Sequence, residues 1–326
     1  MQGRTGGRTR PPVGSRGGTV AAAAADRDGR RKRKRRLGRR GYSWVTLAPV
    51  LALVALFTLF PFGYAAWTSV HRHVLVLQDR PYVGLRNYRS AIEDPLFGGS
   101  IKTSLIFVAF AVPVATLAGL LVALLLNQRV RGFGILLVLV LLPWSIPTVS
   151  AGIMWRLLLH GDFGAVDGFL YRIGAIDSYI QWLSSPDFAM GSVIAVHAWR
   201  EFPLPAILFL AALQTIPPDL AEAARLDRAG AWQRFRYVTL PLLKAPLLIV
   251  LVYETIVAFS VFDLVYVLTG GGPGSATTLF SWFTYTVTFK YLNFGQGAAL
   301  SFIMAAVLLV FIVVYMRVVR VREEVA

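Results

Sequence analysis

The chain has 326 residues, of which 56% are apolar and only 15% are charged, and its mean hydropathy is +0.60. Soluble globular domains carry about 25% charged residues, so this composition excludes that class and predicts a membrane protein. The absence of cysteine excludes disulfide scaffolds, thiolate metal sites and cysteine nucleophiles, and four histidines do not predict a histidine-rich metal site.

Residues 1–42 form a basic tail that contains most of the net charge of +16. The tail holds 14 Lys and Arg residues against Asp26 and Asp28, and its many glycines leave little apolar surface to fold around. We expect a disordered cytoplasmic segment that orients the first span. A nucleic-acid-binding arm is the alternative. A cleaved signal peptide is disfavoured because the basic region is too long and no Ala-x-Ala site follows.

Six apolar stretches reach the roughly 20 residues that a transmembrane helix needs. They cover about residues 43–69, 101–126, 134–159, 190–213, 245–268 and 298–317. Each stretch is continuously apolar, whereas the strands of a membrane barrel would alternate. The predicted fold class is therefore all-α, a polytopic membrane body over residues 43–320 with six transmembrane helices and a short C-terminal tail, 321–326.

The distribution of basic residues predicts that both termini lie in the cytoplasm. With the N-terminus inside, the inner segments hold 24 Lys and Arg residues and the outer segments hold seven. Cytoplasmic loops carry the excess of positive charge in membrane proteins, so the expected topology is N-in and C-in.

Residues 214–244 form the inner loop between the fourth and fifth predicted spans. Pro217 and Pro218 are expected to end the fourth span, and Asp219 is a suitable N-cap for a short helix. Glu222 stands three residues after Asp219, which completes a pattern similar to a capping box.

A second short helix is predicted from Ala231 to Tyr237, after an interruption at Gly230, with Pro241 marking the entry to the fifth span. Trp232 and Phe235 are three positions apart and should share one helix face. Exposed aromatic rings between arginines indicate a docking surface, and a helix lying in the headgroup layer is the alternative.

This loop resembles the EAA loop (E-A-A-x₃-G-x₉-I-x-L-P) of membrane subunits of binding-protein-dependent ABC importers. The matching positions are Glu222, Ala223, Ala224, Asp227, Phe235, Val238, Leu240 and Pro241. Arg228 stands where that pattern has glycine, and we expect Gly230, two residues later, to supply the tight turn. Residues 262–273 (Phe-Asp-Leu-Val-Tyr-Val-Leu-Thr-Gly-Gly-Gly-Pro), Ala276-Thr277-Thr278 and 294–301 (Phe-Gly-Gln-Gly-Ala-Ala-Leu-Ser) are similar to the carbohydrate branch, of the maltose larger-permease and glycerol-3-phosphate first-permease type.

The resemblance implies a prokaryotic cytoplasmic-membrane permease subunit that forms half of a sugar pathway and performs no catalysis. Its implied partners are a second six-span permease, two ATPase subunits, an extracytoplasmic solute-binding lipoprotein and membrane lipids. ATP and Mg²⁺ would be bound by the ATPases, because this chain has no phosphate-binding G-x-x-x-x-G-K-[ST] loop. No cofactor, metal or nucleic acid is expected on this chain.

The same resemblance assigns the coupling to the ATPase to one set of loop residues. Glu222 would make a charged contact, while Ala223 and Ala224 would allow close approach, and Leu240 with Pro241 would attach the loop to the fifth span. The full coupling set is Glu222, Ala223, Ala224, Asp227, Arg228, Gly230, Phe235, Leu240 and Pro241.

Ionisable residues inside the predicted spans are candidates for the substrate path, because such residues are costly in a membrane and usually face a cavity or a partner. Arg200 and Glu201 are adjacent in the fourth span, where they need not pair with each other, and either a cavity or a subunit interface would accommodate them. Glu254 and Asp263 are nine residues apart and should lie on different faces of the fifth span.

Sugars present both apolar faces and hydroxyl groups, so aromatic rings beside polar groups suit them. The candidate path residues are Trp144, Trp199, Tyr253, Glu254, Phe259, Phe262 and Tyr266. For each ring taken alone, core packing or a place in the aromatic belt at the membrane interface is favoured, and only the clustering of rings in the fourth and fifth spans supports a role in the path. A permease for a non-sugar solute such as glycerol-3-phosphate is the alternative function. A membrane enzyme is disfavoured because Glu254, Asp263 and His197 supply too little for hydrolysis or glycosyl transfer.

Overall fold

The computed structural model describes residues 3, 44, 47–128 and 132–319, without the side chains at positions 221 and 225. Apart from residue 3, the predicted basic tail lies outside the described residues, as does the C-terminal tail 321–326. Across the described part of the chain the regular structure is helical, and strand-like pairing is limited to two isolated bridges, His71–Tyr82 and Val74–Asn293. The predicted all-α fold class is confirmed.

The chain divides into two compact units, residues 1–64 and 65–326. From residue 47 on, the first unit is helical and passes through a π-helical turn, η1 (Ala55–Leu59), into α2 (Phe60–Ser69), which continues across the unit boundary.

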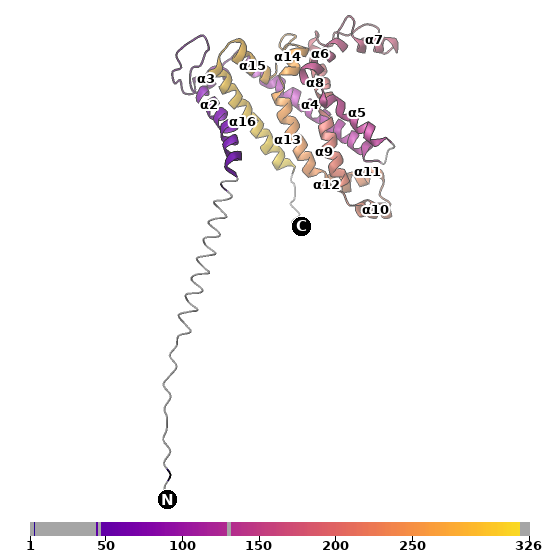
Figure 1. Cartoon of the computed structure of the whole chain (residues 1–326). Coiled ribbons are helices and arrows are strands. Elements are labelled where there is room, and N and C mark those ends of the chain that lie inside the picture. Colours follow the sequence, from indigo (N-terminus) through magenta and orange to yellow (C-terminus); the bar gives the residue numbers. More distant parts are fainter. Residues whose placement is uncertain (1–2, 4–43, 45–46, 129–131, 320–326) are drawn as a thin grey trace. The chain divides into compact units, whose positions relative to one another are not determined.

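The second unit contains the remaining helices, which Figure 1 shows in chain order. Their bounds are α3 Arg86–Ile92, α4 Pro95–Leu126, α5 Phe133–Ser145, α6 Thr148–Leu158, α7 Ala165–Arg172, α8 Pro186–Glu201, α9 Pro203–Gln214, α10 Pro218–Leu226, α11 Ala231–Arg234, η2 Phe235–Thr239, α12 Leu240–Leu242, α13 Lys244–Ser260, α14 Asp263–Leu268, α15 Phe280–Tyr285, η3 Thr286–Lys290 and α16 Phe294–Val318.

Three helices of the described residues are each long and apolar enough to cross a membrane: Leu47–Ser69, Pro95–Leu126 and Phe294–Val318. Three further helix pairs meet the same test only when each bent pair is taken together, which gives up to six spans. The bends are 94° between α5 and α6 and 44° between α8 and α9. The third bend, of 69°, separates α13 from the helical segment Ala231–Leu242, which ends with α12.

Two of these bends occur at prolines that the sequence places inside apolar runs. Ile146 adopts an extended conformation (ψ 127°) before Pro147, because the proline ring disfavours helical geometry in the preceding residue. Pro203 follows Phe202 at the second bend and begins α9, where its missing N–H is not needed. Proline therefore divides two of the predicted spans into pairs of shorter helices.

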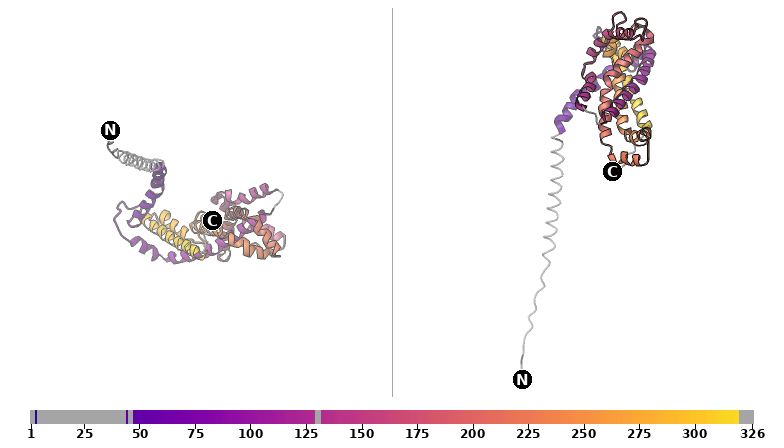
Figure 2. Two further views of the ribbon diagram at one scale, coloured as in Figure 1. Left: turned by 90° about the horizontal axis from the view of Figure 1, so that it is seen from below. Right: turned by 90° about the vertical axis from the view of Figure 1, so that its right-hand side faces the viewer.

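Helix α4 is the central element of the second unit, because it packs against α8, α9, α13 and α15. Two apolar clusters lie along it. One surrounds Phe107 and includes Phe259 and Phe280, and the other lies nearer the end of α4 and includes Phe209 and Leu243. Figure 2 shows the helices of this unit side by side from two further directions.

The predicted span 245–268 is not one helix. Helix α13 ends at Ser260, Val261 is extended (ψ 120°), and α14 begins at Asp263. The freed carbonyl oxygen of Val261 accepts a hydrogen bond from Ser281 Oγ at 2.5 Å. A break inside an apolar segment is tolerated when another part of the protein satisfies the backbone in this way. Glu254 and Asp263 therefore lie on different helices, so their predicted spacing on one helix does not apply.

Gly119 sets the distance between α4 and α9, which gives a prediction about stability. A Cβ atom at this position would lie 2.5 Å from Pro205 Cβ and 2.9 Å from the carbonyl oxygen of Phe202. We expect Gly119→Ala to destabilise the protein by about 1–3 kcal/mol, the range for overpacked sites. The measurement is thermal unfolding in detergent, followed by circular dichroism.

Gly99 in the same helix provides the matched control. Nothing lies within 4 Å of the Cβ that alanine would add there, so Gly99→Ala should leave the unfolding temperature unchanged or raise it slightly. Equal effects of the two substitutions would contradict the close approach of α4 and α9.

Candidate functional site

The loop predicted to couple to an ATPase forms a projecting elbow, which we define as residues 218–242. It consists of α10, α11, η2 and α12, and Figure 1 shows α10 and α11 at the end of the second unit opposite α7 and α14. Glu222 and Ala223 on α10 are exposed, and Ala224 is half-buried. The small side chains therefore leave a helix surface that another protein can approach closely.

The start of α10 differs from the prediction by one residue. The helix begins at Pro218, so Asp219 lies in its first turn and is not the N-cap. Proline is favoured at the first helical position because its fixed backbone angle suits the helix and its missing N–H would have no helical partner. The Asp219 carboxylate still interacts favourably with the positive end of the helix dipole.

The turn after α10 depends on Arg228, not on Gly230. Arg228 has a left-handed backbone (φ 56°), and the N–H of Ala229 donates to the carbonyl oxygen of Ala224 at 3.0 Å. This pattern is a Schellman motif, whose left-handed residue is most often glycine. The glycine of the EAA pattern thus corresponds to the strained position. Gly230 is instead the extended N-cap of α11 (φ −63°, ψ 167°), and the prediction that it supplies the turn is wrong.

The second half of the elbow is longer than predicted. Trp232 and Phe235 share a face, as the spacing predicts, with ring centroids 5.6 Å apart, and Trp232 is 71% exposed. The helical segment does not end at Tyr237, as predicted, but runs on to Leu242 and then meets α13 at 69°. Asp227 is exposed and Leu240 is half-buried.

A second group of functional candidates lies inside the bundle, where α8 and α13 bring ionisable side chains together. His197 and Glu201 on α8 are 2% and 1% exposed, and Glu254 on α13 is 0% exposed. Glu254 and Glu201 are close enough to interact electrostatically. Charged side chains at such depth are rare unless they serve a cavity or a partner.

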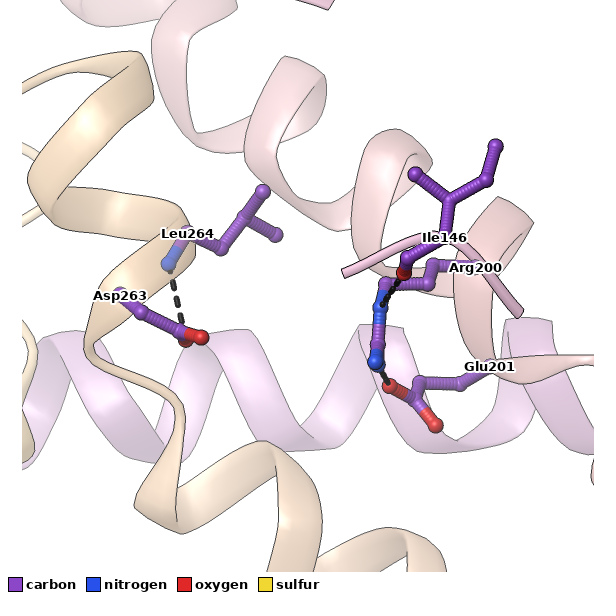
Figure 3. A network of polar contacts seen from close by, with 5 residues as sticks. All are labelled: Ile146, Arg200, Glu201, Asp263 and Leu264. Atoms are coloured by element: carbon purple, nitrogen blue, oxygen red, sulfur yellow. Dashed lines mark hydrogen bonds and ion pairs between the residues drawn. The ribbon is translucent and has the colours of Figure 1, made fainter. Parts of the chain in front are cut away.

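Arg200 links this group to the break between α5 and α6. Its Nε donates to the carbonyl oxygen of Ile146 at 3.4 Å, and its guanidinium forms an ion pair with Glu201 (Figure 3). Arg200 and Glu201 therefore do pair with each other. Adjacent positions on a helix point in different directions, but the Arg200 side chain is long enough to reach the Glu201 carboxylate. Asp263, on the other side of Figure 3, accepts a hydrogen bond from the N–H of Leu264 at 3.0 Å.

Several buried polar atoms of this group have no hydrogen-bond partner among the described residues. They are His197 Nε2, Glu201 Oε2 and both carboxylate oxygens of Glu254. An unpaired buried polar atom costs about 1–3 kcal/mol, so such atoms usually serve a ligand, water or another chain. No group of three or more His, Cys, Asp or Glu side chains in the described residues could hold a metal ion.

A cavity of about 310 Å³, which we call the bundle cavity, opens beside these atoms. It lies between α6, α8, α13 and α14, and its lining consists of Thr148, His197, Arg200, Glu201, Ile256, Val257, Ser260, Val261, Asp263 and Leu264. Both hydrogen-bond donors and acceptors are present, together with aliphatic surface. Sequence reasoning did not find Thr148 and Ser260, because a single hydroxyl in an apolar run carries no signal before the helices are packed.

The aromatic candidates for the substrate path do not gather at one place in the structure. Phe259 is buried in the core between Phe280 and Phe311 and does not line the bundle cavity. Trp199 packs edge-to-face against Trp155 at 5.4 Å. Phe259 and Trp199 therefore take part in helix packing, which was the alternative to a role in the substrate path.

The remaining candidates face less crowded surroundings. Trp144 on α5 is 43% exposed, and Tyr253 on α13 is half-buried. Phe262 stacks on Tyr285 at 4.4 Å, and Tyr266, which is 49% exposed, lies 5.9 Å from the same ring. The structure places Tyr266 in the lining of a separate cavity, described below.

Comparison with known proteins gives a family match over residues 97–323, to the family described as binding-protein-dependent transport system inner membrane component. The chain is 38% identical over 296 residues to the trehalose/maltose transport system permease protein MalF of Thermococcus litoralis, which covers 90% of this chain and 98% of that protein. It is 33% identical to the sulfoquinovosyl glycerol transport system permease protein SmoG of Agrobacterium fabrum, covering 88% of this chain and 93% of that protein.

Solved structures support the same fold. A chain of a bacterial ABC transporter involved in the import of the acidic polysaccharide alginate matches with a TM-score of 0.76 at 21% identity, over 90% of this chain and 100% of that chain. A chain of the alginate transporter in complex with a pentasaccharide-bound periplasmic protein matches with a TM-score of 0.74 at 22% identity, over 88% and 96% respectively.

The left-handed conformation of Arg228 predicts that glycine stabilises the elbow. A side chain in this conformation costs about 1–2 kcal/mol, and Arg228→Gly removes that cost. We expect slower amide hydrogen exchange at Ala229 and along α10 in the Arg228→Gly variant. The Arg228→Ala variant is the control, because it removes the charge but keeps the Cβ atom. Equal protection in both variants would show that the charge, and not the backbone, limits the stability of the turn.

Proposed function

The chain belongs to the family of binding-protein-dependent transport system inner membrane components and is therefore a transporter permease subunit, not an enzyme, and we propose that it forms half of an import pathway for a sugar. The observation that carries this proposal is the projecting elbow, in which an exposed acidic helix with small residues precedes an aromatic pair formed by the exposed Trp232 and the half-buried Phe235. Two relatives, which align with 90% and 88% of this chain, are named for the transport of trehalose/maltose and sulfoquinovosyl glycerol.

The proposed partners follow from a motif that the sequence lacks and from the surface that the elbow exposes. Its sequence contains no phosphate-binding loop, so separate ATPase subunits would bind ATP and Mg²⁺. Each elbow would seat in one ATPase subunit, with Glu222 forming a charged contact and Trp232 filling an apolar depression. A second permease subunit would complete the pathway, and an extracytoplasmic binding protein would deliver the sugar.

The elbow would transmit motion as a rigid lever. Its last helical segment meets α13 through Leu243, which is buried against the apolar cluster around Phe209. A shift of the elbow would therefore rotate α13, and α13 contributes Val257 and Ser260 to the lining of the bundle cavity. Rigid-body movement of this kind is a common way to switch a cavity between two openings.

The bundle cavity is the proposed passage for the sugar. Hydroxyl groups both donate and accept hydrogen bonds, and the cavity offers acceptors on Glu201 and Asp263 and donors on Arg200 and His197. The unpaired atoms of Glu201 and His197 would gain partners when a sugar enters. We place the protein in the cytoplasmic membrane of a prokaryote, with both termini inside and the elbow facing the cytoplasm.

A first test of the proposed function concerns the elbow. In the assembled transporter, Glu222→Ala should lower ATP hydrolysis stimulated by the sugar-loaded binding protein by about tenfold, equivalent to about 1.4 kcal/mol of lost coupling. The permease should still insert into the membrane, because Glu222 is exposed. Glu93→Ala is the control, since Glu93 is an exposed carboxylate on the α3 side of the unit, away from the elbow. Normal stimulation in Glu222→Ala would contradict the role of the elbow.

A second test fills the bundle cavity. We expect Ser260→Trp to abolish uptake of radiolabelled trehalose and maltose into proteoliposomes while basal ATP hydrolysis persists, because the indole occupies the passage but not the elbow. The matched control is Ile249→Trp on the same helix, where the side chain is exposed away from the cavity. Full uptake by a correctly folded Ser260→Trp transporter would show that the sugar takes another route.

A further inference from the structure

A second cavity, which we call the far-end cavity, lies at the end of the unit opposite the elbow. Its volume is about 380 Å³, within the range of about 300–1,000 Å³ typical of small-molecule sites. The last turn of α6, the loop before α7, the loop before α8 and the end of α14 form its walls. Its lining consists of Arg156, Leu159, His160, Gly161, Asp162, Gln181, Leu183, Ser184, Tyr266, Leu268, Thr269 and Gly270.

Most of the groups that face the far-end cavity are polar and already held in position. The Arg156 guanidinium donates to the carbonyl oxygen of Val267 at 3.1 Å, which fixes it to α14. The Gln181 side chain lies directly against Gly161, where even a Cβ atom would come within 2.3 Å of Gln181 Oε1. His160 stacks on Phe163 with ring centroids 3.7 Å apart. The lining is thus an ordered set of hydrogen-bonding groups.

The charge of the lining favours a neutral, hydroxyl-rich ligand over an ion. Arg156 is balanced by Asp162, whose exposed carboxylate lies 3.9 Å from His160 Nδ1. The other polar groups are the imidazole of His160, the amide of Gln181 and the hydroxyls of Ser184, Tyr266 and Thr269. Such a set offers donors and acceptors without a net charge. The half-exposed ring of Tyr266 adds an aromatic face against which the C–H side of a sugar ring can pack.

The far-end cavity and the bundle cavity lie at two levels of the same helix pair, α6 and α14. Thr148 and Asp263 line the bundle cavity, whereas Arg156 and Tyr266 line the far-end cavity. Eight residues of α6 separate Thr148 from Arg156, which corresponds to about 12 Å along the helix. Helices α6 and α14 pack closely, and Val267 comes within 3.2 Å of a Cβ built on Gly152. One pair of helices therefore presents two polar cavities in succession.

We propose that the far-end cavity is a separate binding site for a neutral sugar, occupied before the sugar enters the bundle cavity. This proposal rests on the proposed function, because it assumes that a sugar passes through the unit toward the elbow end. Tyr266 is the stacking residue of the site, and Arg156, Gln181 and Asp162 bind hydroxyl groups.

The absence of cysteine from the chain allows a direct test. In the complete transporter, a single Ser184→Cys variant places one thiol in the far-end cavity, and Ser178→Cys places one on an exposed loop that does not line it. Labelling by a charged methanethiosulfonate reagent is timed with and without millimolar trehalose or maltose. We expect the sugar to slow labelling at position 184 by about fivefold when it fills most sites, with no change at position 178.

Variants of Tyr266 identify the cause of this protection. Tyr266→Ala, added to Ser184→Cys, should abolish the protection, and Tyr266→Phe should retain it because the ring face remains. Loss of protection in both variants would overturn the assignment of Tyr266 as a stacking residue. Protection by the binding protein without sugar would also overturn the proposal, because the cavity would then receive a protein segment.

A Ser260→Cys variant separates this proposal from the proposed function. Sugar protection at position 260 without protection at position 184 would overturn the far-end site and leave the bundle passage intact. Protection at neither position by either sugar would overturn both. Protection at position 184 that persists in a transporter blocked by Ile256→Trp in the bundle cavity would support a separate, earlier site.

Discussion

The need to satisfy every backbone carbonyl in a medium without water is the constraint on which the bundle depends. Two of the breaks in apolar segments are compensated by a specific partner. Arg200 Nε donates to the carbonyl oxygen of Ile146, and Ser281 Oγ donates to that of Val261. These two bonds bring side chains from other helices to the breaks. The breaks therefore become the walls of a polar cavity instead of points of instability.

The same arrangement explains why an ion pair is buried beside that cavity. Arg200 must lie near Ile146 to satisfy the break, and its positive charge then requires a nearby carboxylate, which Glu201 supplies. A buried pair adds little stability by itself because both charges lose their hydration. Its value in this unit is positional, since it leaves Glu201 Oε2 and His197 Nε2 unpaired beside the cavity. The polar groups available to a solute thus follow from the requirements of the fold.

The elbow combines rigidity with one local strain. Arg228 occupies a conformation that favours glycine, yet the Schellman motif forms around it, because the hydrogen bond from Ala229 to Ala224 and the following N-cap at Gly230 hold the turn. Behind the turn, Leu243 is buried and anchors the elbow to α13. In the proposed coupling, the elbow would act as a lever that is attached to α13 at the buried Leu243.

The sequence by itself determined the membrane class, the all-α fold, the position of the elbow and the family, because these depend on composition, apolar run length and local motifs. It also predicted that Trp232 and Phe235 share a face. Tertiary structure alone decided that Phe259 is core, that Arg200 pairs with Glu201, and that α13 ends before Asp263. These outcomes depend on which helices meet, and neither the periodicity of apolar residues nor helix propensity contains that information. A cavity exists only between elements, so its lining becomes known only when α6, α8, α13 and α14 are packed together.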